Sequence, residues 1–112
     1  MQVKLNKRLN AVASLVEENK SVIDIGCDHA LLSIYIAQNK NPIKVIASDN
    51  KNGPLVKAKE NVKYYQVEKQ VKIKLGDGVD PIEDDIDTIV ISGMGGLNMI
   101  GILNIRKTYI RT

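Results

Sequence analysis

The stretch Val22-Ile23-Asp24-Ile25-Gly26-Cys27-Asp28-His29-Ala30-Leu31-Leu32 decides the fold of this chain. Three apolar residues enclose one acid and stop at Gly26, an acidic turn follows, and a helical pattern begins at Ala30. A buried strand, a tight turn and a helix start together form the first βα unit of a nucleotide-binding type of fold. Because ligands in such folds lie outside the carboxyl ends of the strands, residues 26–29 are predicted to contact one.

The composition is that of one small globular domain. The chain has 112 residues, and its hydrophobic fraction of 44% is sufficient for a core. A net charge of +3 permits a polyanionic partner, although a plain basic surface explains it equally well. The single cysteine, Cys27, excludes an internal disulfide and indicates a reducing cytoplasm. We expect neither a signal peptide nor a membrane partner, since no stretch approaches the ~20 apolar residues of a membrane span.

The order of predicted elements gives the sheet topology. Helices are expected over residues 3–18 and 30–38, from the Gly53-Pro54 pair onward, and again after residue 96. Strands are expected over residues 21–25, 43–49, 71–75 and 86–92, the third with the alternation of a sheet edge. Right-handed crossovers then place the strands in the order 3-2-1-4, which is an α/β, Rossmann-like sheet with a crevice between its first and fourth strands.

The turn after the first strand favours a cationic ligand over a pyrophosphate. Only Gly26 matches the dinucleotide fingerprint, because Asp28 and Leu31 occupy the next two glycine positions. Asp28 would repel a pyrophosphate at the helix N-terminus. S-adenosylmethionine carries a sulfonium and an ammonium, which suit Asp24 and Asp28, and a carboxylate, which suits the helix N-terminus near Ala30.

Acids at the other strand ends extend this predicted site. Asp49 ends the second strand and suits ribose hydroxyls, and Asp77 ends the third, where it could accept from an adenine amino group. Structural interpretations stay open. Asp28 could cap the following helix, Asp49 could be a plain turn residue, and Gly76 and Gly78 could serve only backbone conformation.

Two reactive residue types in the turn need separate interpretation. His29 could orient the turn, close over the cofactor, or make a structural hydrogen bond. No second histidine or cysteine pair accompanies it, so no metal site is predicted. Cys27 is interpreted as an inert, space-filling thiol. The predicted cofactor-binding set is Asp24, Gly26, Asp28, His29, Asp49, Asn50, Asp77, Gly78, Gly93, Met94 and Gly95.

Five motifs at this spacing resemble the TrmK family. They are Lys4-Leu5-Asn6-Lys7-Arg8-Leu9, Asp24-Ile25-Gly26-Cys27-Asp28-His29-Ala30, Gly53-Pro54, Gly76-Asp77-Gly78 and Ser92-Gly93-Met94-Gly95-Gly96. Members are bacterial S-adenosylmethionine-dependent methyltransferases that modify N1 of adenine 22 in the tRNA D-loop. The resemblance implies a class I methyltransferase domain followed by a helical C-terminal domain, with tRNA as the partner.

The sequence departs from the family pattern in three places. Cys27 replaces a usual serine, and Asp49 stands where glutamate is common. The resemblance ends near Leu103, and residues 104–112 do not look like the family. We therefore expect the N-terminal part of a methyltransferase domain, stopping after the fourth strand and its helix. Residues 86–92 would then form an exposed apolar edge, which predicts self-association and no methyl transfer to tRNA by these residues alone.

The predicted chemistry needs little from the protein side chains. Residues 92–96 contain no acid and no aromatic residue, unlike motifs that hold exocyclic amines. Adenine N1 has a lone pair and no proton to lose, so alignment suffices and the catalytic residue is left unassigned. Gly93, Gly95 and Gly96 could admit a base close to the backbone or serve only tight packing.

The N-terminal basic residues are predicted to contact nucleic acid. Lys4, Lys7 and Arg8 cluster at helical spacing and could bind tRNA phosphate, although a solvated helix face explains them equally well. Two other functions compete with a tRNA methyltransferase. One is a nicotinamide-dependent oxidoreductase, against which the missing glycines argue. The other is a binding module that holds the cofactor without turnover.

Overall fold

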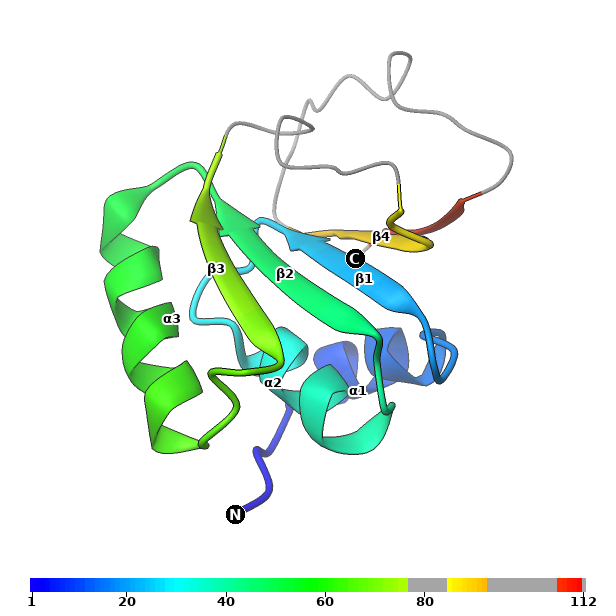
Figure 1. Cartoon of the computed structure of the whole chain (residues 1–112), viewed down its shortest axis with the longest axis horizontal. Helices are drawn as coiled ribbons and strands as arrows, with labels where there is room; N and C mark the ends of the chain where they lie inside the picture. Colours follow the sequence, from blue (N-terminus) through cyan, green and yellow to red (C-terminus); the bar gives the residue numbers. More distant parts are fainter. Residues whose placement is uncertain (77–84, 93–106, 112) are drawn as a thin grey trace.

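A five-stranded parallel sheet forms the centre of the computed structural model, which describes residues 1–76, 85–92 and 107–111. The strands are β1 (Ser21–Ile25), β2 (Lys44–Asp49), β3 (Val71–Leu75), β4 (Thr88–Ile91) and β5 (Thr108–Arg111). Their order is β3-β2-β1-β4-β5, so the predicted order of the first four is confirmed (Figure 1). β1 therefore pairs with β2 on one side and β4 on the other, and a crevice opens at its carboxyl end.

Three helices lie against one face of this sheet: α1 (Lys7–Ser14), α2 (Leu31–Asn39) and α3 (Asn52–Tyr64) (Figure 1). Their buried side chains pack on Val22, Val45 and Val90. The other face carries an isoleucine layer from β1, β2, β4 and the segment just before β4. Its members are Ile23, Ile25, Ile46, Ile86, Ile89 and Ile91. Strands apolar on both faces are typical of the middle of a parallel sheet, which explains the continuous apolar runs in the sequence.

The first helix is shorter than the predicted span of residues 3–18. It begins at Lys7 because the Asn6 side chain caps it, accepting a hydrogen bond from the Leu9 N–H at 2.8 Å. The preceding residues are tied elsewhere, since the Val3 N–H donates to Gln38 Oε1 at 2.9 Å. Lys4 therefore lies outside the helix, and the predicted helical cluster of Lys4, Lys7 and Arg8 is wrong in that respect.

Other boundaries shift by one or two residues. The observed strand β2 begins at Lys44 and β4 covers only Thr88–Ile91, whereas β3 matches the predicted range 71–75 and lies at the sheet edge as expected. α2 runs from Leu31 to Asn39, one residue later than predicted at each end. The helix predicted after residue 96 lies outside the described residues.

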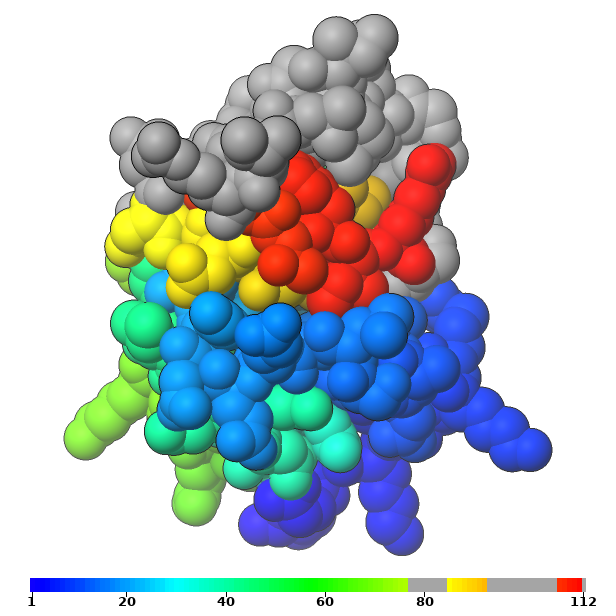
Figure 2. All heavy atoms as spheres, turned by 90° about the vertical axis from the view of Figure 1, so that its right-hand side faces the viewer, coloured from blue at the N-terminus to red at the C-terminus, as the bar shows by residue number. Residues whose placement is uncertain are grey.

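The strand β5 corrects the prediction that the sheet stops at the fourth strand. It pairs in parallel with β4, from Thr88 opposite Thr108 to Ile91 opposite Arg111. Ile110 is buried in the helix-side core, and Figure 2 shows residues 107–111 (red) beside the N-terminal part of the chain (blue). Because β4 has neighbours on both sides, the expected self-association through an exposed β4 edge loses its structural basis.

Candidate functional site

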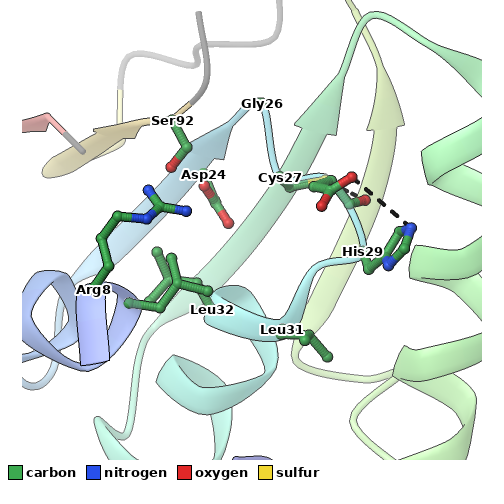
Figure 3. Close-up of a pocket in the computed structure, with 10 residues that line it drawn as sticks. Arg8, Asp24, Gly26, Cys27, His29, Leu31, Leu32 and Ser92 are labelled. Carbon is green, nitrogen blue, oxygen red and sulfur yellow. Dashed lines mark hydrogen bonds and ion pairs between the residues drawn. The ribbon is translucent and has the colours of Figure 1, made fainter. Parts of the chain in front are cut away.

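A pocket lies at the carboxyl end of β1, where the sequence predicted one. It contains about 440 Å³ of empty space, open solvent included. Side chains and backbone from α1, β1, the following turn, α2 and the end of β4 surround it (Figure 3). The lining residues are Arg8, Leu9, Asp24, Gly26, Cys27, Asp28, His29, Leu31, Leu32 and Ser92.

Asp24 is a buried carboxylate at the base of this pocket. Only 1% of the residue is exposed, and its Oδ2 accepts a hydrogen bond of 2.9 Å from the Ser33 hydroxyl on α2. No described residue donates to its Oδ1. Burial raises the pKa of the Asp24 carboxyl to about 7; the Ser33 hydrogen bond opposes this rise, and the negative charge of Asp49 adds to it. Asp24 therefore offers an unpaired oxygen to a donor or cation.

The turn after β1 is held in an unusual backbone conformation. Gly26, Asp28 and Ala30 all have positive φ, at 75°, 54° and 65°. Asp28 occupies the second glycine position of the dinucleotide fingerprint, and aspartate is one of the few other residues that adopts this region readily. The N–H groups of Gly26 and Cys27 both donate to the Ser48 carbonyl, at 2.8 and 2.9 Å, which fixes the turn to β2.

The N-terminus of α2 has no side-chain cap. Its N-cap residue is Ala30, and among the described residues no side-chain cap accepts a hydrogen bond there. The alternative that Asp28 caps this helix is therefore wrong. The uncapped N–H groups at this helix end remain available to an anionic group in the pocket.

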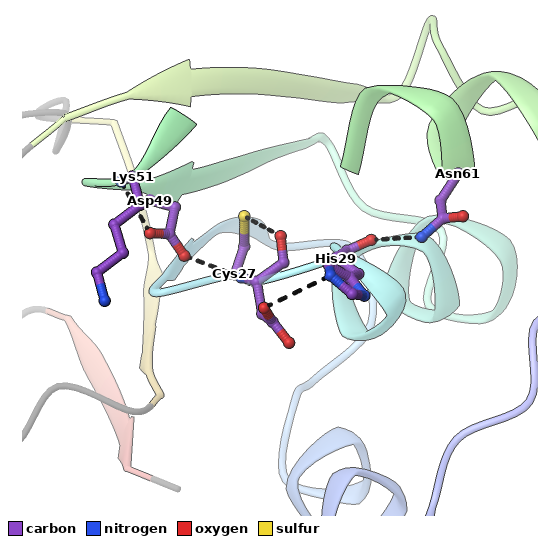
Figure 4. A network of polar contacts seen from close by, with 6 residues as sticks. Cys27, His29, Asp49, Lys51 and Asn61 are labelled. Atoms are coloured by element: carbon purple, nitrogen blue, oxygen red, sulfur yellow. Dashed lines mark hydrogen bonds and ion pairs between the residues drawn. The ribbon is translucent and has the colours of Figure 1, made fainter. Parts of the chain in front are cut away.

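Asp49 connects β2 to the turn. Its Oδ2 accepts from the Asp28 N–H and its Oδ1 from the Lys51 N–H, both at 3.1 Å (Figure 4). Asp49 is not among the pocket-lining residues, and it reaches the pocket only through Asp28. Each carboxylate oxygen can accept a second hydrogen bond, so these contacts leave capacity for hydroxyl groups. The next residue, Asn50, is exposed.

His29 is fixed through its backbone rather than its side chain. Its carbonyl oxygen accepts a hydrogen bond of 2.9 Å from Asn61 Nδ2 on α3, which ties the turn to that helix (Figure 4). The imidazole Nε2 lies 3.9 Å from Asp28 Oδ1, and both side chains are largely exposed. No local sequence pattern indicates Asn61, because this contact depends on how α3 packs.

The surroundings of Cys27 agree with the prediction of a space-filling thiol, and its lack of reactivity stays a prediction. Cys27 is a free, buried cysteine. Burial raises the pKa of the Cys27 thiol well above its usual range, and the carboxylates of Asp24, Asp49 and Asp28 raise it further. The thiol stays protonated at neutral pH and fills space in the turn.

Two pocket residues come from elements distant in sequence. Arg8 projects from α1 and Ser92 from the end of β4, and both point toward Asp24 (Figure 3). Within the described ranges, Arg8 has no carboxylate partner and Ser92 Oγ is buried without a hydrogen bond. Arg8 was assigned to tRNA from the sequence, and Ser92 was noted only as part of a strand end. Lys4 and Lys7 are exposed and do not line the pocket.

The pocket thus brings together four of the predicted cofactor-binding residues, namely Asp24, Gly26, Asp28 and His29. Of the other seven, Asp49 and Asn50 are described but do not line the pocket, and Asp77, Gly78, Gly93, Met94 and Gly95 lie outside the described residues. Over the part of the chain that the structure describes, no group of three or more histidine, cysteine or acidic side chains is placed to hold a metal ion. None of the helices described has both the length and the apolar content that crossing a bilayer requires.

A family model described as a methyltransferase domain matches residues 5–112. This chain belongs to the methyltransferase-domain family. The match covers nearly the whole sequence, including residues 104–112, so the prediction that these residues depart from the family is wrong. The tail that forms β5 is therefore part of this methyltransferase domain.

Individual relatives confirm the resemblance to TrmK. The tRNA (adenine(22)-N(1))-methyltransferase of Bacillus subtilis is 35% identical over 107 residues, which are 95% of this chain and 45% of that protein. The crystal structure of Bacillus subtilis TrmK superposes with a TM-score of 0.78 at 35% identity, covering 85% of this chain and 41% of that one. The structure of Mycoplasma capricolum TrmK with S-adenosylhomocysteine gives a TM-score of 0.73 at 34% identity, covering 80% and 41%. This methyltransferase domain spans about half the length of the curated relatives it matches.

Proposed function

We propose that this methyltransferase domain binds S-adenosylmethionine in the pocket beyond β1 and serves methylation of N1 of adenine 22 in tRNA. The observation that carries the proposal is Asp24, whose Oδ1 is buried at the pocket without a partner. Leaving such an oxygen unsatisfied costs about 1–3 kcal/mol, so a ligand that donates to it is favoured. The matched TrmK structure that contains S-adenosylhomocysteine supports the same choice of ligand.

The residues present fit the charges of this cofactor. Asp24 would receive the ammonium group of its amino-acid end. Arg8, which has two parallel donors and no acidic partner among the described residues, would receive the carboxylate together with the uncapped N-terminus of α2. Asp49 would accept from the ribose hydroxyls with its remaining lone pairs. Asp77, Gly78, Gly93, Met94 and Gly95 stay predictions from the sequence for the adenine and methyl-transfer side.

In the proposed reaction, the protein binds the cofactor and the adenine and orients them toward each other. When bound, S-adenosylmethionine supplies an electrophilic methyl group on a sulfonium. Adenine N1 attacks with its in-plane lone pair and has no proton to lose, so no general base is required of the protein. Exposed Lys4 and Lys7 would contact tRNA phosphates, and the setting would be the cytoplasm, where tRNA is modified.

Two measurements, made one after the other, test the proposal. Calorimetric titration with S-adenosylmethionine, S-adenosylhomocysteine and NAD should show binding of the first two and none of NAD. Methyl transfer to unmodified tRNA, with a tRNA lacking adenine at nucleotide 22 as the control, then tests the reaction. Binding without transfer would favour the non-catalytic module, and NAD binding alone would favour the oxidoreductase that the comparisons already argue against.

Replacing Asp49 by Ala should weaken S-adenosylhomocysteine binding by about 1.5–3 kcal/mol, the scale of a hydrogen bond to a charged group. Two effects contribute, because the substitution removes the ribose acceptor and releases the Asp28 N–H. Calorimetry on the variant gives the change. Asp85→Ala is the matched control, since Asp85 is an exposed acid paired with Lys44 away from the pocket. An unchanged dissociation constant for Asp49→Ala would remove Asp49 from the site.

The basic residues near the N-terminus are expected to have two different functions, with Lys4 and Lys7 contacting tRNA and Arg8 contacting the cofactor. Replacing Lys4 and Lys7 together by Ala should weaken tRNA binding and flatten its salt dependence without changing cofactor affinity. Replacing Arg8 by Ala should instead lower cofactor affinity, because Arg8 lines the pocket. Fluorescence anisotropy over a salt series and calorimetry report the two effects. If Arg8→Ala altered only the tRNA salt slope, its assignment to tRNA phosphate would stand.

A further inference from the structure

Ser33 is a buried polar residue that neither the sequence motifs nor the pocket lining single out. It lies on α2, is 0% exposed, and donates its hydroxyl hydrogen to Asp24 Oδ2 at 2.9 Å. The arrangement divides the carboxylate into two unlike oxygens. Oδ2 is held by α2, and Oδ1 is left without a described partner at the pocket.

Apart from Ser33, few of the described groups near Asp24 stabilise its ionised carboxylate. The charged or polar residues that line the pocket with it are Arg8 from α1, Cys27, Asp28 and His29 from the turn, and Ser92 after β4, and Asp49 on β2 adds its charge from outside the lining. Asp49 repels a charge on Asp24, the Cys27 thiol is neutral, and within the described ranges Arg8 forms no ion pair with it. Ser33 is the described residue whose hydrogen bond favours the ionised carboxylate.

We propose that Ser33 is a positioning residue that holds Asp24 through Oδ2 and aims its Oδ1 at the cationic end of the cofactor. The inference rests on the proposed function for the identity of that ligand. A hydrogen bond to a carboxylate stabilises its ionised form, so removing the Ser33 hydroxyl leaves Asp24 protonated over a wider pH range. A protonated Asp24 cannot attract an ammonium group, so cofactor affinity would then depend on pH through Ser33.

The test compares Ser33→Ala with the unchanged chain and with Ser14→Ala. Ser33→Ala should fold, because alanine favours a helix and the side chain loses only one oxygen. Ser14 is the matched control, since its hydroxyl bonds the Ala11 carbonyl on α1 and lies outside the pocket lining. Ser33→Thr keeps the hydroxyl and should restore the behaviour of the unchanged chain.

The first readout needs no cofactor. The carbon-13 shift of the Asp24 carboxyl, followed by NMR against pH, gives its titration midpoint in the free protein. Ser33→Ala should raise this midpoint by about one pH unit, and Ser14→Ala should leave it unchanged. An unchanged midpoint in Ser33→Ala overturns the inference whatever the cofactor does.

The second readout is S-adenosylhomocysteine affinity against pH. Ser33→Ala should bind about fivefold more weakly than the unchanged chain near pH 7, and the difference should vanish at about pH 9, where Asp24 is ionised in both. A loss that is equal at every pH would mean that Ser33 only supports packing, which also overturns the inference. Absence of binding by every form at every pH would overturn the proposed function instead, while the NMR midpoint still decides the part played by Ser33.

Discussion

Replacing Asp24 by Asn is expected to stabilise the free protein by about 2–4 kcal/mol at pH 8 and to abolish binding of S-adenosylmethionine. The pKa of the folded-state carboxyl is about 7, compared with 3.8 for an exposed aspartate. The folded protein therefore binds this proton more tightly than the unfolded chain does. Its contribution to stability is complete below about pH 4 and is lost as the pH rises through 7.

The size of the gain follows from this difference. Each pH unit between the two pKa values corresponds to about 1.4 kcal/mol, which gives on the order of 4 kcal/mol above pH 7. Part of it is offset, because the new amide places an N–H group beside the pocket. The neutral side chain can no longer attract an ammonium group, so stability and binding are expected to move in opposite directions.

Urea unfolding of both proteins at pH 8 and pH 5 measures this effect. The gain from Asp24→Asn should fall to less than half at pH 5, where the Asp24 carboxyl of the folded protein is already protonated. Asp28→Asn is the matched control, since its side chain is 76% exposed in the same pocket and should change stability little. Equal or lower stability of Asp24→Asn at pH 8 would contradict the assignment of Asp24 as a strained, ligand-directed carboxylate.

Replacing Ile110 by Ala is expected to destabilise the protein by about 2–4 kcal/mol. Ile110 is 5% exposed and packs in the core between the sheet and the helices. Because residues 108–111 form a strand of the sheet, truncating this side chain leaves a cavity that β4 and the helices cannot fill. Ile43→Ala is the control, because Ile43 is 71% exposed and its loss should hardly change the unfolding midpoint.

The comparison of these two isoleucine variants also tests β5, the strand that was not predicted from the sequence. A destabilisation of Ile110→Ala no larger than that of Ile43→Ala would mean that the end of the chain does not dock on β4. Thermal unfolding followed by circular dichroism is sufficient for the measurement.

The central elements were predictable because their signals are local. The run from residue 22 to residue 32 contains strand, turn and helix start in sequence, and the crossover rule then orders the first four strands. β5 was missed because Thr108–Arg111 offers only two apolar residues, Tyr109 and Ile110, which is too short a pattern for periodicity. Its identity as a strand depends on hydrogen bonds to β4, a long-range property.

The same distinction applies to the pocket. Asp24, Gly26, Asp28 and His29 follow one strand and could be assigned from their order alone. Arg8 and Ser92 reach the pocket because α1 and β4 pack beside β1, which no local pattern encodes. Ser33 was hidden for another reason. A serine within an apolar helix pattern does not by itself indicate a function. Its function can be inferred only when the structure shows the buried carboxylate that it contacts.

The central place of β1 also sets an order of events during synthesis of the chain. β2 and β3 leave the ribosome soon after β1 and can complete the unit from Ser21 to Leu75 on one side of it. The other side must wait, because the Ser21 N–H bonds Asp87 Oδ2, a partner 66 residues later, and β4 follows at Thr88. Ser92 lines the pocket from a position later still, so a growing chain exposes one edge of its innermost strand and completes this pocket only after residue 92 has been added.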